Sequence, residues 1–368
     1  MRFPSYILHP ASCISPTDWL YSPVYRNTCL AYPTPSSILD FRDLELLHHY
    51  ATRTSLTLAA KETLPIWQVD IPGEAKTHLF LMHSLLALSA LHLSYVWPEK
   101  RDQYVHVANQ QHEHALSSFR SSVRAITSDN GSAVTAFSFL TVVFSAGLPI
   151  VFGFSGTPNP TSTFIDILQV LRRAWSAVDN VLPGIENGAL GPLIKQAPNS
   201  GKSCSMHVRG REVLDFLQRY NETSPDCEEH KAIYQEALTS LTTFFTNIPN
   251  TPPLWGNSLI WPTSVSDEFF QLLQEKKSFP LILLAHWCVP VFRSPSLWFN
   301  AWAKNIVADI WKMLDGESRN AVIWPAEQVG FIPRELHSNM CLCLDCRPDA
   351  VPGTYCKESA AVLEVGIV

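Results

Sequence analysis

The sequence predicts an all-α fold, arranged as a single large helical domain. Two observations lead to this prediction. Apolar residues recur three and four positions apart over long stretches, which is the spacing of an amphipathic or buried helix. No run of alternating apolar and polar residues predicts a strand, and no repeat of fixed period occurs. Helix packed on helix is therefore the only layer architecture that this pattern supports.

The composition indicates a folded chain with a sizeable core. The chain has 368 residues, of which 46% are hydrophobic, 11% aromatic and only 16% charged. That charged fraction is below the roughly 25% of ordinary soluble domains, so disorder along the whole chain is excluded. The formal net charge is -6, and the 27 Lys and Arg residues are scattered. Direct nucleic-acid binding needs clustered basic residues, so we expect none from this chain.

Three regions are expected along the chain. Residues 1–38 form a Pro-rich leader, residues 39–332 the helical domain, and residues 333–368 a poorly ordered tail that contains cysteines. No apolar stretch near Met1 is long enough for a signal peptide. The nine cysteines are spread too thinly for a disulfide scaffold, which favours a reducing, intracellular compartment.

The first helix is expected to begin after Asp40. The side chain of Asp40 can accept hydrogen bonds from the free N–H groups of the first turn. Leu39 and Leu44 can close a hydrophobic staple around that turn. The apolar spacing continues through Tyr50.

Two longer helices are expected next. One runs from about Glu74 to Val96, and its apolar surface is wide enough to be buried on several sides. Pro98 begins the other at the first turn, where the missing N–H costs nothing. Asn130 and Gly131 are expected to end it.

An uncharged stretch covers residues 130–165, and its strongly apolar part, residues 133–151, has the length of a transmembrane helix. Several hydroxyl side chains and Pro149 interrupt it, and no basic cluster flanks it. We interpret it as a buried helix followed by an irregular loop. The alternative is a membrane-associated protein anchored through residues 133–156.

Later helices follow the same apolar spacing, with two Pro-rich breaks, at residues 183–205 and 251–256, among them. The expected helices are residues 163–178, 227–248, 265–274, 280–289 and 296–314.

Several segments, taken in order, resemble the fungal-specific regulatory domain of zinc-cluster (Zn2Cys6) transcription regulators, especially the branch of the sterol uptake control proteins. The resemblance covers roughly residues 39 to 332. It is carried by Asp43–Tyr50 (DLELLHHY), Leu81–Leu93 (LMHSLLALSALHL), Tyr104, Gln111–Leu116 (QHEHAL), Ala136–Ser138 (AFS), Leu283–Trp287 (LLAHW), Trp302, Ile323–Pro325 (IWP), Glu327 and Gly330.

The resemblance implies a nuclear transcription regulator, with the cytoplasm as the alternative location. In that family six N-terminal cysteines hold two zinc ions and read DNA, and the helical domain regulates them, in some members by binding a sterol. Here residues 1–40 contain only Cys13 and Cys29. We therefore expect no zinc cluster in this chain, and no cofactor. The implied partners are a sterol-like or other apolar small molecule, the transcription machinery, or a second copy of the chain.

An apolar ligand would need an apolar cavity with few polar groups. Residues on three of the expected helices could line one, although plain core packing explains the same residues. The candidates for this pocket are Leu85, Leu88, Leu91, Phe137, Leu140, Phe144 and Trp287.

No motif predicts catalysis or a metal centre, so we expect no enzyme and no metal ligands. The thirteen histidines include His48 and His49, which are adjacent and diverge by about 100° on a helix. Residues 196–203 end like a phosphate loop but lack its first glycine and a preceding strand. Residues 153–156 fall one position short of a serine-hydrolase elbow.

The tail contains four cysteines, which leave two interpretations open. Four thiolates can hold a tetrahedral zinc ion, but this spacing matches no standard zinc knuckle. The other interpretation is a loose tail beyond the domain. The residues are Cys341, Cys343, Cys346 and Cys356.

Overall fold

The computed structural model describes residues 41–194, 208–247, 258–294 and 296–331. Every regular element in these ranges is a helix, and no strand occurs in them. The predicted all-α fold class is thereby confirmed. The chain divides into two units, Met1–Gly330 and Phe331–Val368, and the helices of the described residues lie in the first. The predicted leader and the cysteines of the tail lie outside the described residues.

The first helix, α1 (Phe41–Thr52), forms where it was predicted, while its expected cap, Asp40, lies outside the described residues. It buries only Leu46 and Tyr50. A polar contact also ties it to α3 (Leu79–Val96), because the Ser89 hydroxyl donates to the Leu46 carbonyl oxygen at 2.6 Å. Three short elements follow α1: η3 (Thr54–Thr57), η4 (Ile66–Asp70) and α2 (Ile71–Ala75).

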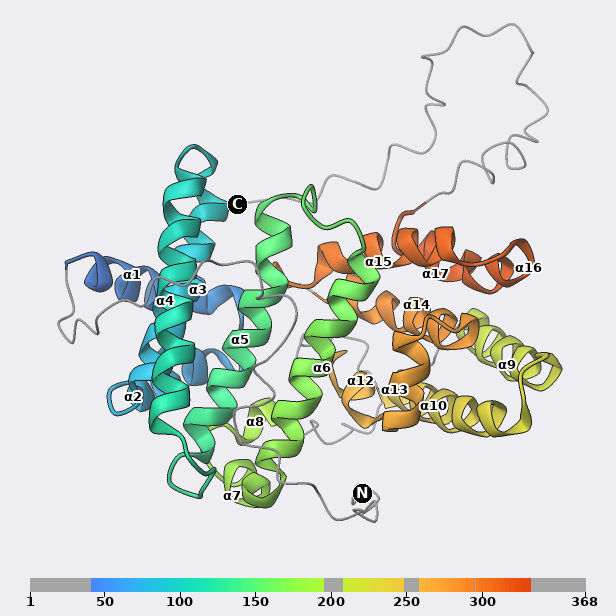
Figure 1. Ribbon diagram of the computed structural model, residues 1–368, viewed down its shortest axis with the longest axis horizontal. Coiled ribbons are helices and arrows are strands. Elements are labelled where there is room, and N and C mark those ends of the chain that lie inside the picture. Colours follow the sequence, from blue (N-terminus) through green and yellow to red (C-terminus); the bar gives the residue numbers. More distant parts are fainter. Residues whose placement is uncertain (1–40, 195–207, 248–257, 295, 332–368) are drawn as a thin grey trace, which may run out of the picture. The chain divides into compact units, whose positions relative to one another are not determined.

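Helices α3, α4 (Arg101–Ser122) and α5 (Gly131–Val151) form the first half of the core (Figure 1). The turn η5 (Pro98–Lys100) joins α3 to α4, with Pro98 at its start as predicted. One phenylalanine from each helix meets the other two, since Phe80, Phe119 and Phe137 have ring centroids 4.6 to 5.4 Å apart. Such aromatic contacts add to the stabilisation from burial.

Two helices, α3 and α5, are long and apolar enough to cross a membrane. In α5, however, 83% of the most apolar window is buried inside the fold, and in α3 the share is 72%. A helix whose apolar surface is covered by other helices behaves as a core helix. The burial therefore favours the predicted core helix over the membrane anchor at residues 133–156.

The second half of the core is built on α6 (Pro160–Val178), which lies beside α5 (Figure 1). Trp302 of α15 (Asn300–Met313) donates its indole N–H to the Ala146 carbonyl oxygen of α5 at 2.8 Å. The further elements are η6 (Asp179–Val181), α7 (Leu182–Glu186), α8 (Gly191–Ile194), α9 (Val208–Thr223), α10 (Glu228–Asn247), α12 (Ile260–Ser264), α13 (Asp267–Gln274), α14 (Ser278–Arg293), α16 (Gly316–Arg319), η7 (Asn320–Val322) and α17 (Ile323–Gln328).

The predicted helix from Glu74 to Val96 is wrong at its start. The structure ends α2 at Ala75 and begins α3 at Leu79. The reason is local competition for a carbonyl group. The Thr77 hydroxyl donates to the Glu74 carbonyl oxygen at 3.1 Å, and His78 Nδ1 lies 3.0 Å from the same atom.

The predicted role of Asn130 and Gly131 is also wrong, because α4 ends at Ser122, Asn130 occupies the N-cap position of α5 and Gly131 is the first residue of that helix. The Asn130 side chain accepts from the Thr127 N–H and donates to the Ala125 carbonyl oxygen, both at 2.9 Å. These bonds close the loop between the two helices. A Cβ at Gly131 would lie 3.1 Å from Val181 Cγ2, so the close packing there favours glycine.

The predicted loop at residues 183–205 is partly helical. The helices α7 and α8 occupy its first part, and residues 195–205 lie outside the described residues. Pro183 and Pro192 each sit in the first turn of one of these helices, where proline is tolerated. The sequence analysis took these prolines as breaks.

We predict that Gly147→Ala destabilises the fold. A Cβ at Gly147 would lie 2.7 Å from the Trp298 ring and 2.8 Å from Leu91 Cδ2. Both neighbours are buried, so the clash should lower the free energy of unfolding by about 1–3 kcal/mol. Urea unfolding followed by circular dichroism measures the change.

Gly73→Ala is the matched control, because a Cβ at Gly73 meets nothing within 4 Å. In a helix this change should be neutral or stabilising by up to about 1 kcal/mol. Equal effects of the two substitutions would contradict the close packing of α5 against Leu91 and Trp298.

Candidate functional site

The predicted pocket residues are all buried, on three helices. Three come from α3, three from α5 and one from α14, and none is more than 2% exposed. They are Leu85, Leu88, Leu91, Phe137, Leu140, Phe144 and Trp287.

Other side chains fill the space around several of these residues. Phe144 stacks on the His112 ring, with centroids 4.2 Å apart and planes 14° apart. Phe137 stacks on Phe119 in the same way, at 4.6 Å. Leu91 lies against the backbone of Gly147. The core between α3, α4 and α5 is close-packed here, and the assignment of these residues to a ligand pocket stays a prediction.

Trp287 lies in a different environment, on α14. Its ring centroid is 5.8 Å from that of Phe164 of α6 and 6.3 Å from that of Trp261 of α12. Its indole N–H donates to the Ser258 carbonyl oxygen at 2.6 Å. These ring and hydrogen-bond partners belong to α6, to α12 and to the segment before α12, not to the helices that carry the other six candidates.

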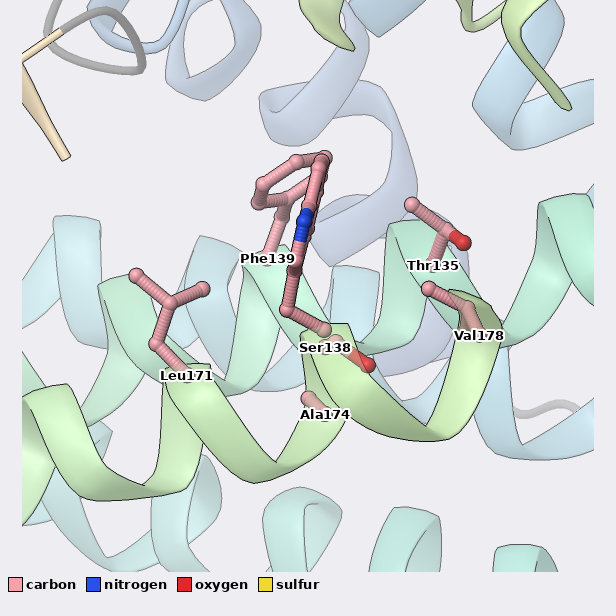
Figure 2. A pocket seen from close by; sticks show the side chains of 7 residues that line it. Thr135, Ser138, Phe139, Leu171, Ala174 and Val178 are labelled. Carbon is pink, nitrogen blue, oxygen red and sulfur yellow. The ribbon is translucent and has the colours of Figure 1, made fainter. Parts of the chain in front are cut away.

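A small hollow lies between α5 and α6 (Figure 2). Its volume is about 10 Å³, enough for one water-sized sphere, whereas ligand pockets occupy about 300–1,000 Å³. A ligand would therefore have to push side chains apart. The hollow is lined by Thr135, Ser138, Phe139, Leu171, Ala174, Trp175 and Val178.

The lining of this hollow is apolar apart from two hydroxyl groups of α5. Ser138 donates its hydroxyl to the Val134 carbonyl oxygen at 2.7 Å, so its proton is already used. The Thr135 hydroxyl is buried and has no hydrogen-bond partner within the described ranges. Trp175 is half-buried, whereas Leu171, Ala174 and Val178 are fully buried. The hollow can therefore accept apolar groups, with Trp175 at its exposed side.

None of the predicted pocket residues lines this hollow. In the sequence, the hydroxyl side chains of residues 133–151 argued against a membrane helix, and Ser138 belonged to the Ala136–Ser138 motif. The lining residues of α6 fell within the predicted helix at residues 163–178. The signal that could have found the hollow is the pairing of small and hydroxyl residues on α5 with Ala174 on α6, but pairing the two helices required the fold.

Among the described histidines, His92, His112 and His286 are buried in the core, whereas His48 and His106 are exposed. His49 Nε2 lies 3.2 Å from His92 Nδ1, and the Thr54 hydroxyl lies 3.0 Å from the same nitrogen. His286 Nδ1 lies 2.8 Å from the Ile282 carbonyl oxygen, to which it can only donate. Among the described residues, no three His, Cys, Asp or Glu side chains form a metal-binding group.

Burial keeps several of these histidines neutral. Desolvation lowers the pKa of His92 and of His286 to about 4 each, and the pKa of His112 to about 3. For His92 the neighbouring His49 acts in the same direction, and for His112 Arg120 does so. These side chains act as neutral hydrogen-bonding and stacking groups near pH 7.

The residues of this chain do not fit the zinc cluster that the resemblance implies for the family. Residues 1–40 contain Cys13 and Cys29, which is too few for a cluster of six thiolates. In the described ranges, the free cysteines are Cys227, which is exposed, and Cys288, which is buried.

Comparison with known proteins gives three fungal relatives. Sterol uptake control protein 2 of Candida albicans is 32% identical over 179 residues, which cover 45% of this chain and 24% of that protein. The protein of the same name from Saccharomyces cerevisiae is 38% identical over 109 residues, 29% of this chain and 12% of that protein. The chain is similar to fungal transcription factors. The third relative, the Zn(2)-C6 fungal-type transcription factor afumD of Aspergillus fumigatus, is 33% identical over 104 residues, 27% of each chain.

The matched part is less than a third of the length of each of these relatives. No family model matches the chain. The similarity supports transcription regulation as the broad function and points away from an enzyme.

We predict that the folded chain loses stability as the pH falls below about 6.5. The unfolded chain binds protons at its histidines there, and the folded chain does not, because burial lowers the pKa of His92, His112 and His286. Each such histidine reduces the free energy of unfolding by up to about 1.4 kcal/mol per pH unit between pH 6.5 and its folded pKa. Urea unfolding at a series of pH values measures the slope.

The matched variant is His112→Phe, which keeps an aromatic ring against Phe144. It should make the slope between pH 6 and pH 4 shallower, whatever its effect on stability at pH 7. A slope that stays the same would mean that His112 is not held neutral by the fold.

Proposed function

We propose that this chain is a regulatory domain of a fungal transcription regulator and acts without a DNA-binding motif of its own. The similarity to the sterol uptake control proteins and to a Zn(2)-C6 transcription factor carries the proposal. The all-α fold supports it, because the described helices pack closely around one another, as a regulatory helical domain requires. The expected location is the nucleus.

We further propose that the domain responds to an apolar molecule of the sterol class. The names of two relatives refer to control of sterol uptake. The hollow between α5 and α6 is where we place the entry of such a ligand, because its lining is mostly apolar; at about 10 Å³ it must widen to admit one. A ligand that parts these helices would change their packing, and it shifts an equilibrium only by its differential affinity for the two arrangements. The predicted pocket residues on α3 and α5 remain the candidates for a deeper part of the site.

The second candidate function is docking of a protein, either a component of the transcription machinery or a second copy of the chain. The described helices leave several large apolar side chains more than 40% exposed, among them Leu56, Tyr95, Val96 and Trp97. Exposed apolar residues of this size, when grouped, mark contact surfaces. If no lipid changes the melting temperature of the chain, protein docking remains as the proposed function.

We predict that fusion of the full chain to an unrelated DNA-binding domain changes expression of a reporter that carries the matching site. The unfused DNA-binding domain is the control, and a fluorescent tag verifies that the fusion reaches the nucleus. Unchanged expression from a nuclear, folded fusion would contradict a regulatory function for this chain.

We predict that a sterol raises the melting temperature of the full chain. A ligand that binds only the folded state stabilises it by about 2.7 kcal/mol at 100 times its Kd. Thermal unfolding with a panel of sterols, fatty acids and other apolar molecules measures the shift.

Ala174→Leu adds bulk to the hollow and should reduce the shift if the ligand enters between α5 and α6. Ser176→Leu makes the same kind of change at an exposed position of the same helix and should leave the shift unaltered. If none of the molecules in the panel raises the melting temperature, the proposal that the domain senses an apolar ligand is excluded.

A further inference from the structure

A chain of polar side chains links α1, α3 and α4. The Gln111 side chain donates from Nε2 to the Asp43 carboxylate oxygen at 2.9 Å. A carboxylate only accepts hydrogen bonds, so the amide nitrogen of Gln111 must face Asp43. The amide oxygen therefore faces the other way, toward His83.

This arrangement fixes the tautomer of His83. His83 Nδ1 lies 2.6 Å from Gln111 Oε1, which can only accept. Nδ1 must carry the proton, and in the neutral ring the lone pair is then on Nε2. Burial lowers the pKa of His83, so the neutral form predominates near pH 7. The sequence spacing did not show this, because Asp43 is far from His83 along the chain.

A second imidazole lies next to His83. The His114 ring of α4 has its centroid 5.2 Å from that of His83, with the planes 35° apart. Two imidazoles that share one metal ion at about 2.0–2.1 Å from each nitrogen have their centroids roughly 5 Å apart at a tetrahedral angle. We propose that His83 and His114 form a site for a divalent transition metal ion of the class that prefers imidazole, such as Cu²⁺, Ni²⁺ or Zn²⁺.

The protein supplies two ligands to this site, and water supplies the others. Within the described part of the chain no third His, Cys, Asp or Glu side chain completes the set. His83 and His114 are both partly exposed, so water can reach them. Gln111 acts as a positioning residue, because its bond to Nδ1 orients the ring as partners of metal-bound histidines do. Asp43 in turn orients Gln111.

The bound ion would connect α3 to α4, and through Gln111 and Asp43 it would connect both to α1. Because α1 buries only Leu46 and Tyr50, polar contacts are a large part of what fixes it to the core. Metal binding would therefore stabilise the position of α1. This inference does not depend on the proposed function.

The test is Cu²⁺ binding to the full chain, read by electron paramagnetic resonance and calorimetry. Thiols are first alkylated with iodoacetamide, since the cysteines at positions 341–356 could hold metal themselves. The wild type should bind one ion with two imidazole nitrogens in the superhyperfine pattern. His83→Ala and His114→Ala should each reduce that pattern to one nitrogen and weaken binding at least tenfold.

His106→Ala is the matched control, because His106 is exposed on the same helix as His114 and should change neither readout. Gln111→Met keeps the shape of the side chain and should weaken binding about 10- to 100-fold while both nitrogens remain. Far-ultraviolet circular dichroism verifies that each variant is folded. Two results would overturn the proposal. One is Cu²⁺ binding through two imidazole nitrogens that persists in the His83→Ala, His114→Ala double variant, and the other is a wild-type chain that shows no such binding.

Discussion

Close packing of α3 against α5 is the constraint on which the rest of the structure depends. Both helices are apolar around most of their circumference, so other elements must cover most of each. The backbone of α5 at Gly147 lies against Leu91 and Trp298, closer than any side chain would allow. With these helices in contact, α4 and α6 take the faces that remain. The later helices then cover α6.

Much of this fold was predictable from the sequence, because core helices have a strong periodic signal. The predicted positions of α1, α6 and α10 agree with the structure to within a few residues. The errors fall where prolines sit in the first turn of short helices, as in α7 and α8, and where side chains compete with the backbone for hydrogen bonds. Thr77 and His78 bond to the Glu74 carbonyl oxygen and break a helix that apolar spacing alone would continue. Helix propensity and apolar spacing do not reveal such hydrogen bonds between side chains and the local backbone.

The site was less predictable, for a physical reason. Burial of the candidate pocket residues follows from periodicity, whereas the small volume left between two helices depends on which side chains face each other. Thr135 and Ala174 meet at the hollow only because α5 and α6 run side by side. The contact of His83 with Gln111, and of Gln111 with Asp43, likewise joins α1, α3 and α4, with Asp43 and Gln111 68 residues apart along the chain. Contacts of that kind belong to the tertiary structure.

The indole hydrogen bonds of two buried tryptophans, on α12 and α15, limit how the helices around them can move. Trp261 donates its indole N–H to the Ala237 carbonyl oxygen, and Trp302 donates to that of Ala146. Each bond joins different helices in a buried setting where no water could replace the lost partner. A small shift of one helix along its neighbour would break the indole hydrogen bond completely, because the N–H and the carbonyl oxygen would no longer be aligned. Rearrangement of this core should therefore proceed in discrete jumps between alternative sets of indole contacts.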